Sequence, residues 1–256
     1  MPNSIELCQL SDVQNAIRGS DIGVTLGNIV RWTRFHTEAQ CGGETLEEWV
    51  DLLGPTAIVL THQEHFVEFV LQFTDLFGIE DEELFILAAA IHDIGEAAIG
   101  DISAQVKSEE DELEEVAAAR VLIDQLAVSP ECKILLLHAY NQVIAGKNAE
   151  LQSLFKTLER LEYLDTGLHV ARQLNAGRKM KQGWYLVAKV LAFDLSKILI
   201  YREAHRKIVD RYLAENSQTI DSSFEQSAVA VDNTFEDRFL AVRASWESWK
   251  QISYIH

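Results

Sequence analysis

The sequence contains few residues that interrupt helices. Only three prolines occur in 256 residues, at Pro2, Pro55 and Pro130, so long tracts of chain lack the residue that most strongly breaks a helix. These tracts are rich in Ala, Leu, Glu, Lys and Gln, with apolar residues recurring at three- and four-residue steps. This combination predicts an all-α fold.

Cysteines are equally scarce. The three that occur, Cys8, Cys41 and Cys132, are scattered, and no two of them form a CxxC pair. An odd set of this kind predicts neither a disulfide framework nor a zinc site built from thiolates. A reducing, cytoplasmic setting fits it better.

Basic residues are few in relation to acidic ones. The chain has 22 Lys and Arg against 40 Asp and Glu, which gives a formal net charge of -18. Nucleic-acid polymers and anionic membrane surfaces are both bound through Lys and Arg, so neither is expected as a partner. A small phosphorylated molecule remains compatible where a bound cation reverses the local field.

Long apolar runs are also missing. The longest, residues 83–91, is too short to span a bilayer and leads directly into charged residues. The N-terminal residues 1–7 carry no basic stretch ahead of an apolar core, so no secretory signal is expected. The chain is expected to be soluble.

Helices are expected over most of the chain. Apolar periodicity predicts them at residues 56–77 with a stop at Gly78, and at residues 84–92, 109–126, 130–140, 155–174 and 235–255. Residues 187–213 form a long candidate helix that can be split. Residues 216–232 are richer in Ser, Asn, Gln and Thr, and we expect a loop there.

His92 and Asp93 follow the most apolar of these helices. Burying a charge without a partner is costly, and a cation would satisfy both side chains. Glu96 follows at a helical spacing, so it can reach the same rim of a pocket. The alternative is a hydrogen-bonded core histidine beside a helix-end cap, and the dipeptide alone does not decide between them.

Further ligand types lie on neighbouring predicted helices. His62 and His65 occur upstream, and Asp165 occurs downstream. Together with His92 and Asp93, they can complete a metal site with nitrogen and oxygen ligands.

This pattern resembles the HD-domain superfamily of metal-dependent phosphohydrolases, which shows a His, then an adjacent His-Asp pair, then a distant Asp. The resemblance covers about residues 28–172, and its best-preserved part is HDIGEAAIGD, from His92 to Asp101. In that family four such residues hold a divalent cation. The resemblance therefore implies His65, His92, Asp93 and Asp165 as ligands, with His65 chosen because Glu64-His65 matches the family's Glu-His pair. His62 is the alternative first ligand.

Within the superfamily, the order of motifs is most similar to the YfbR-like 5′-deoxynucleotidase branch. That branch implies that Glu96 assists departure of the leaving group and that Asp101 orients water or substrate. It also implies that Arg31 and Trp32 contact the substrate. From the residues alone, Glu96 can be a solvated charge, Asp101 a helix cap and Trp32 a core residue.

The sequence departs from that branch in two ways, and these weaken the prediction of the substrate more than the prediction of the metal site. The interval between Arg31 and His65 is longer, with residues 40–55 reading as an insertion, and the chain beyond Arg172 has no counterpart. We expect an all-α HD-domain helical bundle with additional C-terminal helices. Its segments are an N-terminal extension (1–27), an HD-domain core (28–215), and a C-terminal loop and helix packed on the core (216–256).

The function implied is that of an enzyme, a divalent-metal-dependent phosphohydrolase. It would remove phosphate from a small phosphomonoester, foremost a nucleoside or deoxynucleoside 5′-monophosphate. Alternatives are another phosphorylated metabolite, a pyrophosphorylated or cyclic nucleotide, or a non-catalytic module that binds metal or nucleotide. One divalent cation is expected, with Mn, Co or Mg ahead of Zn, Ni or Fe, and a homo-oligomer is compatible with the sequence.

Overall fold

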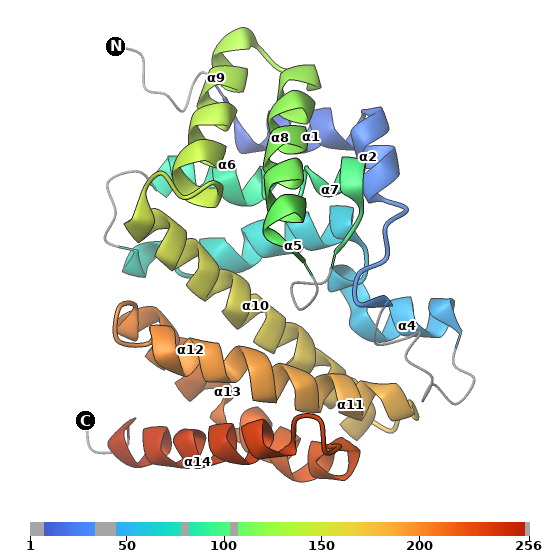
Figure 1. Cartoon of the computed structure of the whole chain (residues 1–256), viewed down its shortest axis with the longest axis vertical. Coiled ribbons are helices and arrows are strands. Elements are labelled where there is room, and N and C mark those ends of the chain that lie inside the picture. Colours follow the sequence, from blue (N-terminus) through green and yellow to red (C-terminus); the bar gives the residue numbers. More distant parts are fainter. Residues whose placement is uncertain (1–7, 34–44, 78–81, 103–106, 254–256) are drawn as a thin grey trace. The chain divides into compact units, whose positions relative to one another are not determined.

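The structure, a computed structural model, describes residues 8–33, 45–77, 82–102 and 107–253 (Figure 1). Within these ranges the chain is mostly helical, and extended pairing is limited to an isolated antiparallel bridge between Val30 and Ile58. The prediction of an all-α fold is confirmed.

The chain divides into two compact units. Unit 1 comprises Met1–Arg34 and Gly54–Phe155, and unit 2 comprises Phe35–Leu53 and Lys156–His256. This division does not coincide with the three segments expected from the sequence.

Unit 1 is organised around a buried helix. Its helices are α1 (Leu10–Arg18), α2 (Asp21–Leu26), α5 (Val59–Leu71), α6 (Glu82–Ile91), α7 (Glu96–Ile99), α8 (Glu109–Gln125) and α9 (Pro130–Ala139), with 3-10 turns at Gly54–Thr56 and Thr74–Leu76 and a π-helical turn at Tyr140–Ile144. Helix α6 packs against α1, α5 and α9. Its last four residues, three alanines and Ile91, are buried, so the His-Asp pair that follows begins inside the unit.

Unit 2 carries the rest of the chain. Helix α10 (Ala149–Asn175) begins in unit 1 and continues in unit 2. The other elements of unit 2 are α4 (Leu46–Leu53), α11 (Lys181–Val190), α12 (Ser196–Tyr201), α13 (Arg206–Ser227) and α14 (Glu236–Ser253), with a π-helical turn at Leu191–Leu195 and a 3-10 turn at Ala228–Ala230. Trp246 and Trp249 stack with ring centroids 4.7 Å apart.

The loop predicted at residues 216–232 is wrong over most of its length, because α13 continues to Ser227. Ile220, Ser223, Phe224 and Ser227 are all buried and recur at three- and four-residue steps, which is a helical face. The hydroxyl of Ser227 donates to the Ser223 carbonyl at 2.6 Å. The serines are therefore small residues of a packed helix rather than signs of a loop.

The helix predicted at residues 56–77 is shorter than expected. It begins at Val59 and ends at Leu71, and a 3-10 turn follows it at Thr74–Leu76. Its predicted stop at Gly78 lies outside the described residues. The predicted insertion at residues 40–55 contains α4, while residues 40–44 also lie outside the described part.

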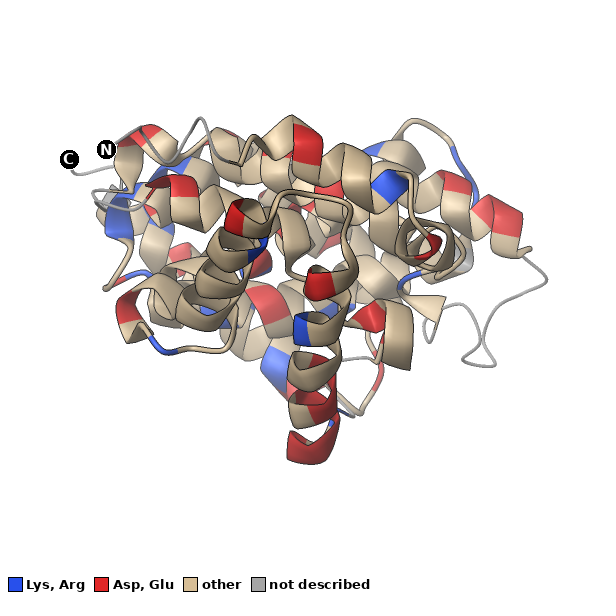
Figure 2. Cartoon of the chain, turned by 90° about the horizontal axis from the view of Figure 1, so that it is seen from above, with Lys and Arg blue, Asp and Glu red and all other residues tan. Residues whose placement is uncertain are grey.

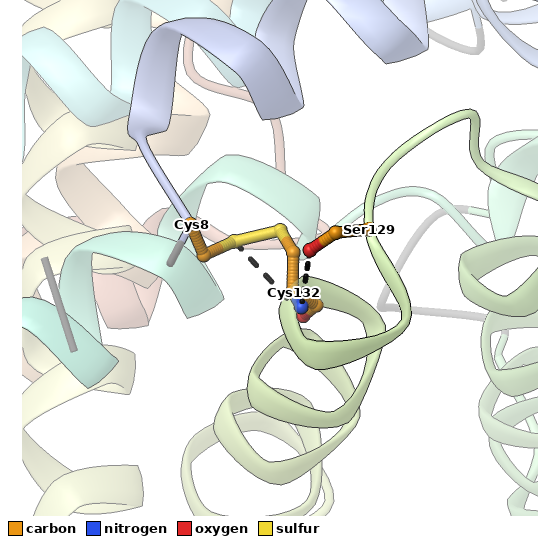
Figure 3. Close-up of a disulfide and its surroundings, with 3 residues drawn as sticks. All are labelled: Cys8, Ser129 and Cys132. Atoms are coloured by element: carbon orange, nitrogen blue, oxygen red, sulfur yellow. Dashed lines mark hydrogen bonds between the residues drawn. A yellow bond between two sulfur atoms is a disulfide. The ribbon is translucent and has the colours of Figure 1, made fainter. Parts of the chain in front are cut away.

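Cys8 and Cys132 form a disulfide within unit 1 (Figure 3), so the expectation of no disulfide is wrong. Cys132 lies in the first turn of α9, where its backbone N–H donates to the hydroxyl of Ser129 at 3.1 Å. The two cysteines are 124 residues apart, a separation that carries no local signal in the sequence. The reducing setting inferred from the cysteines loses this support.

Helix α8 begins with the strongest run of acidic residues (Figure 2). Glu109 to Glu112 occupy its first turn, where negative charge is stabilised by the helix dipole. Ser108 and Asp111 form a capping box: the Ser108 hydroxyl accepts from the Asp111 N–H at 3.2 Å, and the Asp111 carboxylate accepts from the Ser108 N–H at 2.7 Å. Across the described residues, no helix has the length and apolar content needed to cross a membrane.

Candidate metal centre

A short extended pairing fixes the start of α5. The backbone N–H of Val59 donates to the Ile29 carbonyl at 3.1 Å, and that of Arg31 donates to the Ala57 carbonyl at 2.8 Å. His62 lies in the first turn of α5, where its N–H donates to the Ile58 carbonyl at 2.8 Å. Its imidazole points inward and is only 1% exposed.

Three ligand-type atoms converge in unit 1. The Nε2 atom of His62 lies 3.2 Å from Nε2 of His92 and 3.3 Å from Oδ2 of Asp93. The Nε2 atom of His92 lies 3.1 Å from the same carboxylate oxygen. These three residues form a group that could hold a metal ion.

The three separations fit one divalent cation. Two ligand atoms bound at about 2.1 Å to the same ion lie about 3.0 Å apart at right angles and about 3.4 Å apart in a tetrahedral arrangement. The observed 3.1 to 3.3 Å fall between these values. The Nδ1 atom of His92 lies 2.8 Å from the Ala89 carbonyl, and a hydrogen bond from Nδ1–H leaves the Nε2 lone pair for the ion.

The same arrangement is unfavourable without added positive charge. When His92 donates from Nδ1 to Ala89, its neutral Nε2 presents a lone pair to the Asp93 oxygen, and two lone pairs at this distance repel. With protons on the imidazole nitrogens that face Asp93, the contact is favourable instead: burial raises the pKa of Asp93, but the charge of a protonated His92 and hydrogen bonds from both histidines outweigh this and hold it well below its usual value. Asp93 is therefore an ionised carboxylate, as a ligand must be.

The structure brings His62, and not His65, to the His92-Asp93 pair. His65 lies three residues further along α5, which turns its side chain by about 300° around the helix axis. It is partly exposed and does not belong to the cluster. The neighbouring Glu64 contacts the guanidinium of Arg18, so Glu64-His65 lies on the more exposed side of α5.

Glu96 opens α7, directly after the His-Asp turn. Its backbone N–H donates to the Asp93 carbonyl at 3.0 Å, and its side chain is 7% exposed. Its Oε2 atom has no hydrogen-bond partner among the described residues. Burial raises the pKa of Glu96 well above its usual value, the charges of Asp93 and Asp101 raise it further, and Arg31 lowers it. Glu96 therefore holds a proton more tightly than an ordinary glutamate.

Gly95 lets α8 approach this turn. A Cβ atom at this position would lie 2.7 Å from both Cγ and the backbone oxygen of Glu115. Only glycine fits this contact without movement of the backbone of α8.

Arg31, Trp32 and Asp101 are brought to the same neighbourhood. The guanidinium of Arg31 is buried, with Nη1 3.4 Å from the Thr56 carbonyl and its central carbon 5.8 Å from the Trp32 ring. Trp32 has a φ of 62°, a conformation that costs a non-glycine residue about 1–3 kcal/mol and often marks functional sites. In this conformation its backbone N–H donates to the Asp101 carboxylate.

The charge of Asp101 is set by the same groups. Burial raises its pKa, Arg31 lowers it, Asp93 raises it and the hydrogen bond from Trp32 lowers it, leaving a value above the usual one. These electrostatic interactions join Arg31, Trp32, Glu96 and Asp101 to the cluster of His62, His92 and Asp93. The catalytic and substrate-binding roles that the resemblance implies for them stay predictions.

Asp165 lies on α10 in unit 2. Its Oδ1 atom accepts a hydrogen bond from the hydroxyl of Tyr212, on α13, at 3.0 Å. Burial raises the pKa of Tyr212 well above its usual value, and the neighbouring Asp165 carboxylate raises it further, so the phenol keeps its proton and acts as the donor. The role of Asp165 as a fourth ligand stays a prediction.

Comparison with known proteins identifies no relative of this chain. No family model matches this chain, and no curated protein or solved structure matches it. The resemblance to the HD-domain superfamily therefore rests on the motif residues alone.

Proposed function

We propose that the protein is a divalent-metal-dependent phosphohydrolase that acts on a small phosphomonoester. The observation that carries the proposal is the convergence of His62, His92 and Asp93, with the buried carboxyl of Glu96 three residues along the chain from Asp93 and its Oε2 atom without a hydrogen-bond partner in the described part of the chain. A metal-ligand set beside a group that retains its proton has the components needed to cleave a phosphate ester.

The donor set suits several cations. Two imidazole nitrogens and one carboxylate oxygen are compatible with Mn²⁺, Co²⁺ or Mg²⁺, and also with Zn²⁺, Ni²⁺ or Fe²⁺. When bound, such an ion supplies charge that neutralises phosphoryl oxygens and acidifies a coordinated water. His62, His92 and Asp93 would hold it.

The other residues have distinct tasks in this proposal. Glu96 donates its proton to the leaving oxygen, a role that its raised pKa favours. Asp101, held by the Trp32 N–H, orients the attacking water or the substrate. Arg31 binds the phosphoryl group through its fork of N–H donors.

The nature of the ester is the finer part of the proposal. The resemblance to the 5′-deoxynucleotidase branch favours a nucleoside or deoxynucleoside 5′-monophosphate, and Trp32 beside Arg31 offers a ring on which a base could stack. Other phosphorylated metabolites, and pyrophosphorylated or cyclic nucleotides, are the competing substrates.

Elemental analysis followed by a phosphate-ester screen tests the proposal. Purified protein should bind about one divalent ion per chain, as expected for one ligand set, and hydrolyse at least one ester when Mn²⁺ or Co²⁺ is added. Glu109→Gln, on the exposed first turn of α8, serves as the control for Glu96→Gln. A protein that neither contains nor takes up metal would refute the site. A metal-loaded protein inert on every ester would instead point to a binding module.

A further inference from the structure

A partly buried ion pair lies next to the His-Asp turn, and the proposed chemistry does not use it. The ammonium of Lys107 contacts the carboxylate of Glu115, and the two side chains are only 19% and 12% exposed. Withdrawing two charges from water is costly, and the gain from pairing them often does not repay that cost. A position so close to the turn therefore calls for a reason beyond stability.

Both residues are held firmly. Helix α7 packs against α8, and the absence of a side chain at Gly95 lets the backbone and Cγ of Glu115 lie against the turn. Lys107 directly precedes the capping box of Ser108 and Asp111, which fixes where the chain enters α8. Glu115 is thus anchored to the residue before Glu96, and it anchors Lys107 in turn.

The ammonium of Lys107 also interacts with the carboxylates of the site. Burial lowers its pKa, but the hydrogen bond and charge of Glu115, together with the charges of Glu96 and Asp93, raise the pKa above its usual value. Lys107 therefore stays charged. A lysine ammonium has three N–H donors, so the contact with Glu115 leaves two available for another acceptor.

We propose that Lys107 binds the phosphoryl group of the substrate and that Glu115 is the residue that positions its ammonium. This inference rests on the proposed function, which supplies a phosphate to the site. The carboxylates of Asp93, Asp101 and Glu115 would repel an approaching dianion, and Arg31 with Lys107 provides two cations to offset them. Two cations that contact different phosphoryl oxygens also fix the orientation of the ester.

Binding of inorganic phosphate to the Mn²⁺-loaded protein, measured by calorimetry, tests the role of Lys107. Lys107→Met should weaken binding by about 10–100-fold, the value of one hydrogen bond to a charged group, and Lys107→Arg should restore most of it. Lys133→Met is the matched control, because Lys133 contacts the Asp124 carbonyl at the other end of α8 and should leave phosphate binding unchanged. Unchanged phosphate affinity in Lys107→Met would overturn the proposal.

Glu115→Asp tests the positioning role without changing the charge. Shortening the side chain moves the carboxylate away from Lys107, and we expect phosphate binding to weaken by about 3–10-fold, the value of one ordinary hydrogen bond. In the Lys107→Met background the same change should have no effect on phosphate. A purely structural role would lower the melting temperature in both backgrounds and leave phosphate affinity unchanged, which would overturn the role of Glu115.

The two proposals fail in different ways. Phosphate affinity that depends on Lys107 in a protein that hydrolyses no ester would refute the proposed function and support the inference. Ester hydrolysis with phosphate affinity and KM indifferent to Lys107 would refute the inference alone. Should Lys107→Met not fold, Lys107→Gln keeps a polar group at this position and gives the same measurement.

Discussion

The acidic groups of the two units are arranged differently. In unit 2, three acids are paired with cations: Asp194 accepts from Arg160 at 3.0 Å, Asp210 accepts from Arg202 at 2.5 Å and 2.9 Å, and Asp221 accepts from Lys250 at 2.7 Å. The first and third pairs join residues 34 and 29 positions apart, as expected of contacts that hold helices together.

In unit 1, several acidic side chains lie close together, and they share fewer cations than the paired acids of unit 2. The pKa of Glu96 is raised by burial and by Asp93, Asp101 and Glu115, and Arg31 only partly offsets them. Two imidazoles of the same group present nitrogen atoms to the Asp93 carboxylate at 3.1 and 3.3 Å. Paired acids can stabilise a fold by themselves, whereas a crowded set costs stability unless a ligand brings positive charge. This contrast is the main physical reason to place function in unit 1.

The largest effect expected is on turnover. Glu96→Gln mimics the shape of the protonated acid but cannot release a proton, so kcat should fall by about 10²–10⁴-fold, the usual contribution of a general acid. Metal content should stay at the wild-type level. Steady-state kinetics on the best ester, together with elemental analysis, measures both.

The counterpart in unit 2 is Asp194→Asn, which should leave kcat per folded molecule unchanged, because Asp194 belongs to an ion pair with Arg160. Full turnover in Glu96→Gln would remove the proton-donor role. Equal losses in both variants would erase the contrast between the units.

The next effect is on metal affinity. His62→Ala should weaken binding of Mn²⁺ or Co²⁺ by more than about 100-fold, because loss of a residue that only hydrogen-bonds to a metal ligand already weakens binding by about 10–100-fold. His65→Ala, the matched control on the same helix, should bind the ion as the wild type does. Equilibrium dialysis distinguishes the two, and the opposite result would restore His65 as the ligand.

The sequence contained the signal for His62, although the family motif pointed to His65. Val59, Phe66 and Val70 mark the apolar face of α5, and His62 lies on that face, four residues before Phe66 and three after Val59. Periodicity alone would therefore have placed His62 inside the unit. The Glu-His pair is a poorer guide because a sequence motif does not show which face of the helix its residues occupy.

Other features were beyond the reach of sequence. Helices α5, α6, α8, α9, α10 and α14 and the His-Asp turn follow from local apolar periodicity and could be predicted, whereas α1, α2 and α4 lie in segments where no helix was expected. The Cys8–Cys132 disulfide, the positive φ of Trp32 and the contact of Gly95 with Glu115 depend on residues brought together by folding. Composition also misled at residues 216–227, where buried serines resemble a loop only when their helical spacing is ignored.

A third effect concerns pH and unit 2. Burial raises the pKa of Asp194 to about 6, although the charge and hydrogen bond of Arg160 lower it. The folded protein then keeps a proton that the unfolded chain releases near pH 3.8. The contribution of Asp194 to the free energy of unfolding is therefore fully present below pH 3.8 and is lost as the pH rises to about 6. A difference of roughly 2 pH units corresponds to about 3 kcal/mol.

Urea unfolding between pH 4 and pH 7 can detect this loss. Asparagine does not titrate, so the destabilisation caused by Asp194→Asn should be largest near the acid end and shrink by about 3 kcal/mol towards neutral pH. Asp237→Asn, at an exposed position on α14, is the control. A constant difference across the range would show that Arg160 keeps Asp194 ionised, and that pairing outweighs burial in unit 2.

The smallest effect expected compares one glycine from each unit. Gly95 has an ordinary helical φ of −62°, so alanine there meets no conformational penalty, only the contact with Glu115. Because one of the atoms in the way is backbone, Gly95→Ala should cost about 1–3 kcal/mol in unfolding free energy and lower kcat by displacing Glu96. In unit 2, a Cβ on Gly167 would lie 2.9 Å from Cγ1 and 3.1 Å from Cβ of Val190, a buried β-branched side chain with little rotational freedom, so Gly167→Ala should also cost stability. It should leave kcat per folded molecule unchanged, and a Gly95→Ala variant whose kcat is equally unaffected would mean that α8 is free to move away from the site.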